Sequence, residues 1–283
     1  MSARPKVVVT GAGGYIGPHV VRGLLERDMD VVAVVRPGNT TQLDPRAERL
    51  EADILAPGFD PAVLADAAPR LVHLAWKDGF THNSPAHMGQ VSGHYSLLNA
   101  LAERGVRRIV ALGTMHEVGY WEGAVDEDTP TKPLSLYGVA KDALRKALPL
   151  SLPEMTSLAW ARCYYIYGDD RRNRSIFARL LEAVDEGRET LPFTTGKNKY
   201  DFIRVEELGR QLAALTAAEE VHGVVNCSTG LPVSLAEKVE EFIAENELPI
   251  RLEYGAFPDR PYDSPATWGN ATRINAVLAA HPS

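Results

Sequence analysis

A tyrosine and a lysine four residues apart, Tyr137 and Lys141, form the pair in this chain whose types and spacing best suit chemistry. On a helix, residues i and i+4 share one face. A lysine ammonium beside a phenol lowers the pKa of that phenol from about 10 towards neutrality. Such a phenol can give a proton to a carbonyl oxygen, or take one from an alcohol, while a hydride moves. Because Tyr-x-x-x-Lys also arises often by chance, the surrounding elements decide its meaning.

Two polar residues ahead of this pair are candidates for the same site. The apolar run from Arg108 to Leu112 predicts a strand that stops at Gly113 and Thr114. Ligands of parallel sheets bind at the carboxyl ends of strands, so we expect the Thr114 hydroxyl to hold the reacting oxygen. His116 follows two residues later, and a neutral imidazole can abstract a proton next to a carbonyl. In the alternative interpretation, His116 only hydrogen-bonds the substrate or packs in its loop.

A glycine-rich turn near the N-terminus predicts where a cofactor would bind. Val7 to Val9 form a β-branched run that suits a buried parallel strand. Gly11, Gly14 and Gly17 follow as G-x-x-G-x-x-G, and then apolar residues recur at helical spacing. Glycines let the backbone approach a pyrophosphate, and a helix N-terminus offers free N–H groups. We therefore predict the start of a dinucleotide-binding βαβ unit, with a simple tight corner as the alternative.

The alternation of strand and helix patterns predicts an α/β fold with a doubly wound parallel Rossmann sheet. Residues 1–168 are expected to form the dinucleotide-binding domain, with a return strand near 200–228. Residues 169–283 are expected to form most of a smaller, interleaved substrate lobe. The predicted elements include strands at Val31–Val35, Glu51–Leu55, Arg70–Ala75 and Val224–Cys227, and helices at Pro85–Glu103, from about Tyr137, and at Ser175–Glu186.

The ends of the second and third strands bear on the cofactor. An acidic residue usually closes the second strand of an NAD-binding unit, but here Arg36 follows Val35. A guanidinium matches a 2′-phosphate, so we predict NADP as the cofactor, with NAD as the alternative. Alternatively, Arg36 is only a solvated loop residue. Asp53 is a candidate for the adenine edge, with Ile54 packing on the ring. Alternatively, Asp53 only caps the helix from about Pro61.

Bulk composition excludes several classes of protein. The chain has 283 residues, of which 45% are hydrophobic and 24% charged, as in ordinary globular domains. Its net charge of −7 argues against nucleic acid as a partner, and no apolar run approaches the ~20 residues that span a bilayer. Cys163 and Cys227 are expected to be reduced core residues of a cytoplasmic protein. His82, His87 and His94 match no metal-binding spacing, so no metal site is predicted.

Together these patterns resemble the extended short-chain dehydrogenase/reductase superfamily, of the NAD-dependent epimerase/dehydratase type. Its members are largely nucleotide-sugar epimerases, dehydratases and ketoreductases. The resemblance covers nearly the whole chain. It rests on Thr10–Gly17, Asp53–Ile54, His73–Ala75, the Tyr137/Lys141 pair, Arg162–Gly168, Tyr200–Val205, Asn226–Gly230, and Arg260, Pro261 and Asp263 ahead of Pro265–Trp268.

The resemblance implies roles for individual residues. Thr114, Tyr137 and Lys141 would form the catalytic triad, and Lys141 would also bind the nicotinamide ribose. Arg260 would grip the diphosphate of the substrate. The helices at Pro85–Glu103 and Leu136–Leu148 would pair two copies into a homodimer. The remaining cofactor-lining residues would be Tyr15 and Ile16 in the glycine turn, Leu74, Ala75 and Trp76 after the fourth strand, and Tyr164 and Ile166 beside the nicotinamide.

Departures from the family pattern narrow the reaction. Dehydratases carry Asp-Glu directly after the catalytic threonine, whereas this chain has Met115 and His116, which argues against elimination of water. A run of three arginines near the predicted crevice could neutralise a substrate diphosphate. Of the run, Arg174 is the candidate contact, and a solvated surface is the alternative.

We therefore predict NADP-dependent reduction of a nucleotide-linked 4-keto-6-deoxy sugar by the Thr114, Tyr137 and Lys141 triad. The alternative is a nucleotide-sugar 4-epimerase with tightly bound NAD, which would oxidise and re-reduce the same carbon. A dinucleotide-sensing protein without chemistry is a remote third interpretation, since such a protein would not need both Tyr137 and Lys141.

Overall fold

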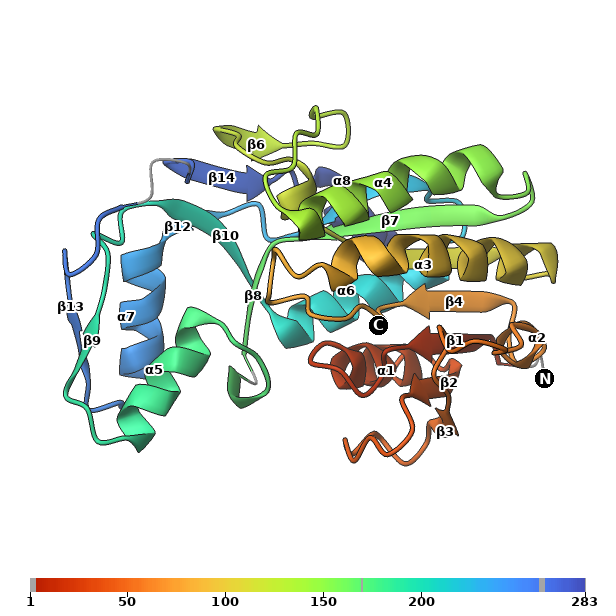
Figure 1. Ribbon diagram of the computed structural model, residues 1–283, viewed down its shortest axis with the longest axis horizontal. Helices are drawn as coiled ribbons and strands as arrows, with labels where there is room; N and C mark the ends of the chain where they lie inside the picture. Colours follow the sequence, from red (N-terminus) through yellow and green to blue (C-terminus); the bar gives the residue numbers. More distant parts are fainter. Residues whose placement is uncertain (1–3, 169, 260–262, 283) are drawn as a thin grey trace.

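The computed structural model describes residues 4–168, 170–259 and 263–282, and its centre is a parallel sheet (Figure 1). The strands of this sheet are β1 (Lys6–Thr10), β2 (Asp30–Val35), β3 (Glu48–Glu51), β4 (Arg70–His73), β5 (Arg108–Thr114), β7 (Ser157–Cys163) and β11 (Gly223–Cys227). Their order is β11-β7-β5-β4-β1-β2-β3, and neighbours run parallel. The strand order reverses at β1 and β4, which is where ligands bind in open α/β sheets. The predicted Rossmann-type sheet is confirmed.

Helices cover both faces of the sheet, as Figure 1 shows. On one face lie α1 (Gly17–Leu25), α6 (Val205–Ala217) and α8 (Thr272–Ala280); on the other lie α2 (Ala62–Ala65), α3 (Ala86–Glu103) and α4 (Leu136–Ser151). Val20, Val21 and Leu24 of α1 are fully buried at helical spacing. A Cβ on Gly23 would lie 3.0 Å from the carbonyl oxygen of Gly209, so small residues let α1 and α6 pack closely.

A smaller lobe lies beyond the carboxyl ends of these strands (Figure 1). Its sheet contains β12 (Pro232–Ser234), β10 (Lys199–Arg204), β14 (Ala266–Gly269) and β6 (Gly123–Val125), with β8 (Tyr165–Tyr167) also on β10. Beside it lie β9 (Thr190–Pro192), β13 (Arg251–Glu253), α5 (Ile176–Asp185) and α7 (Leu235–Glu245). Because β6 and β8 precede residue 169 while β11 and α8 return to the large sheet, the two lobes are interleaved.

Several predicted boundaries differ from the structure. The third strand ends at Glu51, not at Leu55, and the helix expected from Pro61 is a four-residue helix. Strand β4 ends at His73, so Leu74 and Ala75 lie in the loop that follows, while β5 continues through Thr114. Strand ends are set by pairing with neighbours, which local patterns do not contain.

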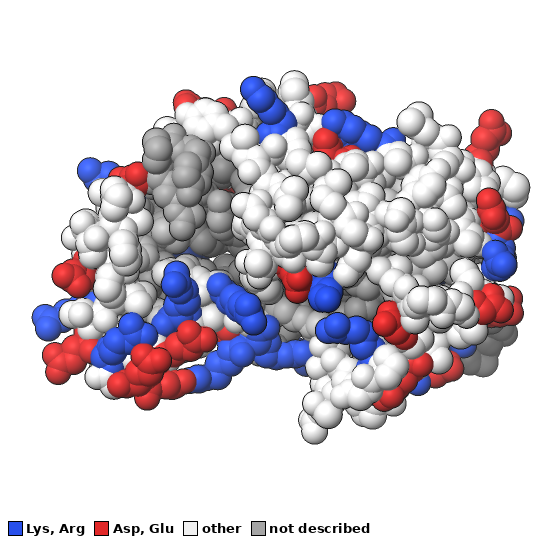
Figure 2. Space-filling model, in the orientation of Figure 1, with Lys and Arg blue, Asp and Glu red and all other residues white. Residues whose placement is uncertain are grey.

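The structure also describes the helices, the two cysteines and one face of the surface. Within the described ranges, no helix is both long enough and apolar enough to cross a membrane. Cys163 and Cys227 are both free and buried, as expected. The face seen in Figure 2 is hollowed between the two lobes, and Lys and Arg side chains gather along the lower edge of this hollow.

A buried carboxylate, Asp201 of β10, holds the small lobe together. Its oxygens accept hydrogen bonds from the backbone and hydroxyl of Thr229 (2.9 and 2.7 Å), from Gly230 N (2.9 Å) and from Gly269 N (3.2 Å). Three segments distant in sequence therefore meet at one side chain that is fully buried.

We expect Asp201→Ala to lower the free energy of unfolding by about 3 kcal/mol, because buried donors lose a charged acceptor. The exposed Asp185, which pairs with Arg171, provides a control: Asp185→Ala should lower the free energy of unfolding far less, because exposed ion pairs contribute little. Urea unfolding followed by circular dichroism measures both. Equal losses in the two variants would contradict the role given to Asp201.

Candidate functional site

The glycine turn is shaped by close backbone contacts at the end of β1. Gly11 has φ +73°, and a Cβ there would lie 2.7 Å from the backbone nitrogen of Ala75. A Cβ on Gly17 would lie 2.2 Å from the carbonyl oxygen of Ala12. Helix α1 begins without a side-chain cap on its N-cap residue Ile16, so its first N–H groups are available to an anion. This cradle fits the pyrophosphate of a dinucleotide.

The three predicted catalytic residues meet at the ends of β5 and α4. The Thr114 side chain lies close enough to the Tyr137 phenol to act on its pKa. Ser135 caps α4 by accepting a hydrogen bond from Gly138 N (3.2 Å). Lys141 Nζ donates to the carbonyl oxygen of Leu112 (2.7 Å) and lies 3.9 Å from the centre of the Trp76 ring. The spacing of Tyr137 and Lys141 on one helix face therefore brings both to the strand end that carries Thr114.

The acidity of Tyr137 differs from the prediction. Burial raises the pKa of Tyr137 above the ordinary value, and the nearby Thr114 side chain only partly opposes that rise. The expected lowering by Lys141 is wrong for the free protein, because the ammonium is turned towards Leu112 and Trp76. Burial also lowers the pKa of Lys141 to about 8. At neutral pH, Tyr137 is thus a protonated phenol, the form that donates a proton.

Three imidazoles surround the Tyr137 ring. The ring centres of His82, His87 and His116 lie 5.8, 5.2 and 6.0 Å from it, and His82 and His116 are 4.2 Å apart. Burial, with a smaller contribution from His82, lowers the pKa of His116 to about 4. The neutral ring beside Tyr137 fits a proton acceptor, and its role as a base stays a prediction. Sequence spacing gave no reason to place His82 and His87 here.

Trp76 is held by two histidines, His94 and His87. It stacks on His94 with ring centres 4.6 Å apart, and its Nε1 donates to His87 Nδ1 (3.0 Å). His94 in turn hydrogen-bonds to His73 (3.0 Å), which contacts the Thr10 hydroxyl (2.8 Å). His73 is thus a buried core residue with both ring nitrogens in hydrogen bonds. Trp76 contacts Lys141 beside the catalytic pair, and its contact with the cofactor stays a prediction.

Glu117, which the sequence analysis overlooked, lies fully buried beneath Thr114. Its Oε1 accepts hydrogen bonds from Thr114 N (2.8 Å) and Trp160 Nε1 (2.9 Å). The spacing T-x-x-E at residues 114–117 is that of a capping box, and both bonds of that motif are present. That spacing was the available signal for this residue.

The adenosine end of the predicted site contains a carboxylate that the sequence analysis did not place. Arg36 is exposed at the end of β2, but β3 brings Glu51 opposite Val35. Glu51 Oε2 accepts a hydrogen bond from Gly38 N (3.4 Å). Glu51 was overlooked because only the residues of β2 itself were considered.

The remaining predicted cofactor contacts are placed as follows. Asp53 is exposed and accepts a hydrogen bond from Leu55 N (3.2 Å), whereas Asp60 binds Ala62 N (2.9 Å) at the start of α2. The alternative role of Asp53 as a helix cap is therefore wrong. Ile54 is buried, while Leu74, Ala75 and Ile166 are partly exposed, and the Tyr164 hydroxyl donates to Asn226 Oδ1 (3.1 Å).

One member of the arginine run, Arg172, lies against the glycine turn, while the predicted contact of Arg174 with the substrate diphosphate stays a prediction. Arg172 Nη2 lies 3.3 Å from the Gly14 carbonyl oxygen and 3.4 Å from that of Gly13. The Tyr15 hydroxyl donates to the Gly168 carbonyl oxygen (2.6 Å), which fixes the same segment over the turn. Arg174 is exposed, and Arg260 lies outside the described residues.

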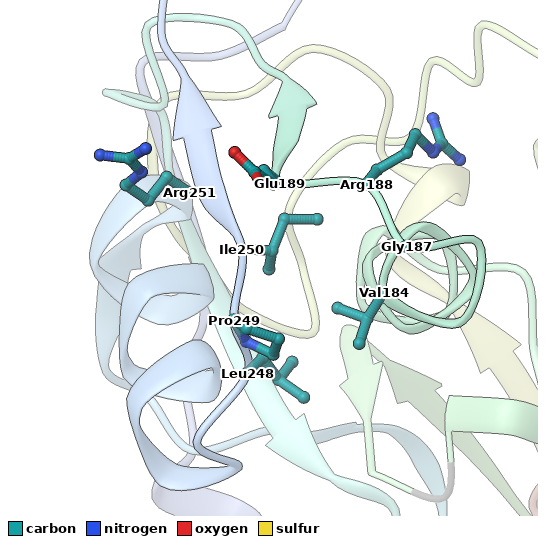
Figure 3. Close-up of a pocket in the computed structure, with 8 residues that line it drawn as sticks. All are labelled: Val184, Gly187, Arg188, Glu189, Leu248, Pro249, Ile250 and Arg251. Carbon is teal, nitrogen blue, oxygen red and sulfur yellow. The ribbon is translucent and has the colours of Figure 1, made fainter.

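A cavity in the small lobe and clusters of metal-ligating side chains are the other places where a ligand could bind. A cavity of about 450 Å³ lies in the small lobe between the end of α5 and the strands β9 and β13 (Figure 3). Its lining residues, Val184, Gly187–Glu189 and Leu248–Arg251, include no predicted site residue. No cluster of three metal-ligating side chains occurs in the part of the chain that the structure describes.

Comparison with known proteins gives the family. Residues 7–228 match the NAD dependent epimerase/dehydratase family. The chain belongs to this family. It is 43% identical to a dTDP-6-deoxy-L-talose 4-dehydrogenase (NAD(+)) of Aggregatibacter actinomycetemcomitans, over 93% of this chain and 98% of that protein. It is 26% identical to a putative UDP-glucose 4-epimerase of Methanocaldococcus jannaschii, over 90% and 86% of the two chains.

A solved structure of MoeE5 in complex with UDP-glucose and NAD has a TM-score of 0.78 and 26% identity, covering 97% of this chain and 92% of that one. The predicted superfamily, and an oxidoreductase or epimerase as the class of enzyme, are therefore confirmed.

In the free protein, we expect the His116 ring to stay neutral as the pH falls to about 5 and to charge only near pH 4, because burial opposes the cation. Imidazole ¹⁵N shifts, assigned with His116→Asn, measure this titration. A midpoint near 6.5, the ordinary value, would contradict it.

Proposed function

We propose that this enzyme interconverts a hydroxyl and a ketone at C4 of a nucleotide-linked 6-deoxy hexose, with NAD as the redox partner. The observation that carries the proposal is the approach of the Thr114 side chain to a protonated Tyr137 at the carboxyl end of β5. The substrate class is supported by the 43% identity to the talose 4-dehydrogenase over nearly both chains.

The residues of the site divide the work. The turn from Gly11 to Gly17 would hold the dinucleotide, whose nicotinamide supplies the hydride when bound. In the reductive direction, Tyr137 gives its phenolic proton to the C4 oxygen as that oxygen gains charge. The Thr114 hydroxyl orients the same oxygen, and the Lys141 ammonium stabilises the phenolate left on Tyr137 until solvent returns a proton.

NAD is proposed over NADP because of Glu51. A carboxylate beside Arg36 repels the two negative charges of a 2′-phosphate and offers acceptors to ribose hydroxyls. The printed names of the talose dehydrogenase and of the MoeE5 complex both contain NAD. The NADP prediction rested on Arg36 alone, which is exposed and has a carboxylate for a neighbour.

We also propose that α3 and α4 pair two copies into a homodimer. Met88 and Val139 on these helices are 46% and 37% exposed, and such apolar positions suit an interface.

Tyr137→Phe should lower kcat for reduction at least about 100-fold, because it removes the proton donor. NADH oxidation is followed with a panel of nucleotide-linked 4-keto-6-deoxy sugars, and Tyr120→Phe, at an exposed tyrosine, serves as the control. Full turnover in Tyr137→Phe would contradict the mechanism. Accumulation of a C4 epimer without net change in NADH would instead favour the 4-epimerase.

Glu51→Gln should strengthen binding of NADPH about fivefold and leave binding of NADH within about twofold, because only the 2′-phosphate is repelled by the carboxylate. Quenching of protein fluorescence by each dinucleotide gives the two dissociation constants. The exposed Glu48→Gln on the same strand is the matched control. A parent enzyme that binds NADPH more tightly than NADH would overturn the choice of NAD.

A further inference from the structure

One fully buried carboxylate joins three elements beneath the site. Glu117 Oε1 binds Thr114 N at the end of β5 and Trp160 Nε1 of β7, as described above. Its Oε2 lies 3.4 Å from Arg162 Nε of β7 and 3.6 Å from Arg145 Nε of α4. The short 3₁₀ turn that carries Glu117 is thus tied to both strands and to the helix of Tyr137.

The ion pairs make this carboxylate costly to remove. Arg162, like Glu117, has no exposed side-chain surface, and its Nη1 donates to the Asp126 carbonyl oxygen (3.0 Å). A guanidinium stays cationic, so a neutral residue at 117 would leave a buried charge without this counter-ion. Burial raises the pKa of Glu117, while Arg162, Thr114 N–H, Trp160 and Arg145 oppose that rise.

The spacing on α4 extends the effect to the catalytic pair. Tyr137, Lys141 and Arg145 follow one another at intervals of four, so they form one stripe along the helix. Glu117 contacts the stripe at Arg145 and faces the other two members. Its negative charge raises the pKa of Lys141 and contributes to the raised pKa of Tyr137.

We propose that Glu117 is a positioning residue of the C4 oxidoreductase: it locks the end of β5 against α4 and supplies a fixed negative charge beneath Tyr137 and Lys141. The inference rests on the proposed function and deepens it. The charge keeps Lys141 cationic over a wider pH range, so the same carboxylate sets both the geometry of the reacting oxygen and the alkaline limit of reduction.

Of the titratable groups near this pair, Cys163, His94, His116 and His73 carry no charge in the relevant pH range. Burial raises the pKa of the Cys163 thiol on β7 to about 12. Burial and Lys141 lower the pKa of His94 on α3 to about 3, and burial lowers that of His116 to about 4. The pKa of His73 on β4 is likewise well below its usual value, and His82 and His87 lie against the Tyr137 ring.

Glu117→Gln separates charge from shape, since the amide oxygen can still accept the bonds from Thr114 and Trp160. Lys141 is charged below its pKa of about 8, so reduction is expected to fall as the pH rises through that value. Without the carboxylate charge, this alkaline limb should move to lower pH by about one unit, and kcat at neutral pH should fall. The dissociation constant of NADH should change by less than about twofold, because the carboxylate does not contact the predicted cofactor cradle.

Two further variants distinguish the proposed role from simple loss of stability. Asp142→Asn also neutralises a carboxylate bound to Arg145 (2.6 Å), but the other partners of Asp142 are Thr131 and Lys146, so it should lower Tm and leave the pH limb in place. Glu117→Asp keeps the charge and shortens the side chain, so kcat should fall while the limb stays. A limb that is unmoved in Glu117→Gln, or moved equally in Asp142→Asn, would overturn the proposal.

A second readout works without any substrate. The Nζ resonance of Lys141, followed by ¹⁵N NMR against pH, should titrate lower in Glu117→Gln and unchanged in Asp142→Asn. If the parent reduces no nucleotide-linked keto sugar, the proposed function fails, yet this titration still tests Glu117. An identical Lys141 midpoint in parent and Glu117→Gln would refute the electrostatic part of the inference.

Discussion

One contact, between the Thr114 side chain and Tyr137, joins the end of a central strand to the first turn of a helix. It requires that α4 approach β5 closely. Gly138 permits this, since a Cβ there would lie 2.3 Å from the His116 carbonyl oxygen. Ser135 fixes the start of the helix, and the β5–β7 pairing fixes the strand. Backbone contacts thereby fix the positions of the Thr114 and Tyr137 side chains.

The surroundings of Thr114 and Tyr137 explain why a phenol is suited to carry the proton. The site is buried, and the neighbouring imidazole of His116 is neutral, so charge is costly there. The Lys141 ammonium is accommodated by a carbonyl oxygen and by the face of Trp76. A protonated phenol beside a stabilised cation is suited to giving up its proton only when a negative oxygen forms. Burial of Tyr137 thus supports the proton-donating role that is proposed for it.

The interleaving of the lobes follows from the position of the site. Strands β6 and β8 leave the first half of the chain just after β5 and β7, so they carry the small lobe directly over the carboxyl edge of the sheet. Arg172 and Tyr15 then connect the segment after β8 to the glycine turn. Both the cofactor cradle and the substrate lobe therefore depend on the same sheet edge.

The sequence alone determined the features that depend on local spacing. Glycines at intervals of three, strands of β-branched residues and the i, i+4 separation of Tyr137 and Lys141 each define a local geometry, and the structure reproduces all three. Tertiary packing decided the rest. Glu51 lies beside the end of β2 only because β3 pairs with β2. The Lys141 ammonium binds the Leu112 carbonyl oxygen and faces Trp76, both far from it in the sequence. Burial sets the pKa values of Tyr137 and His116, and burial is a sum over contacts between distant segments that spacing along the chain does not record.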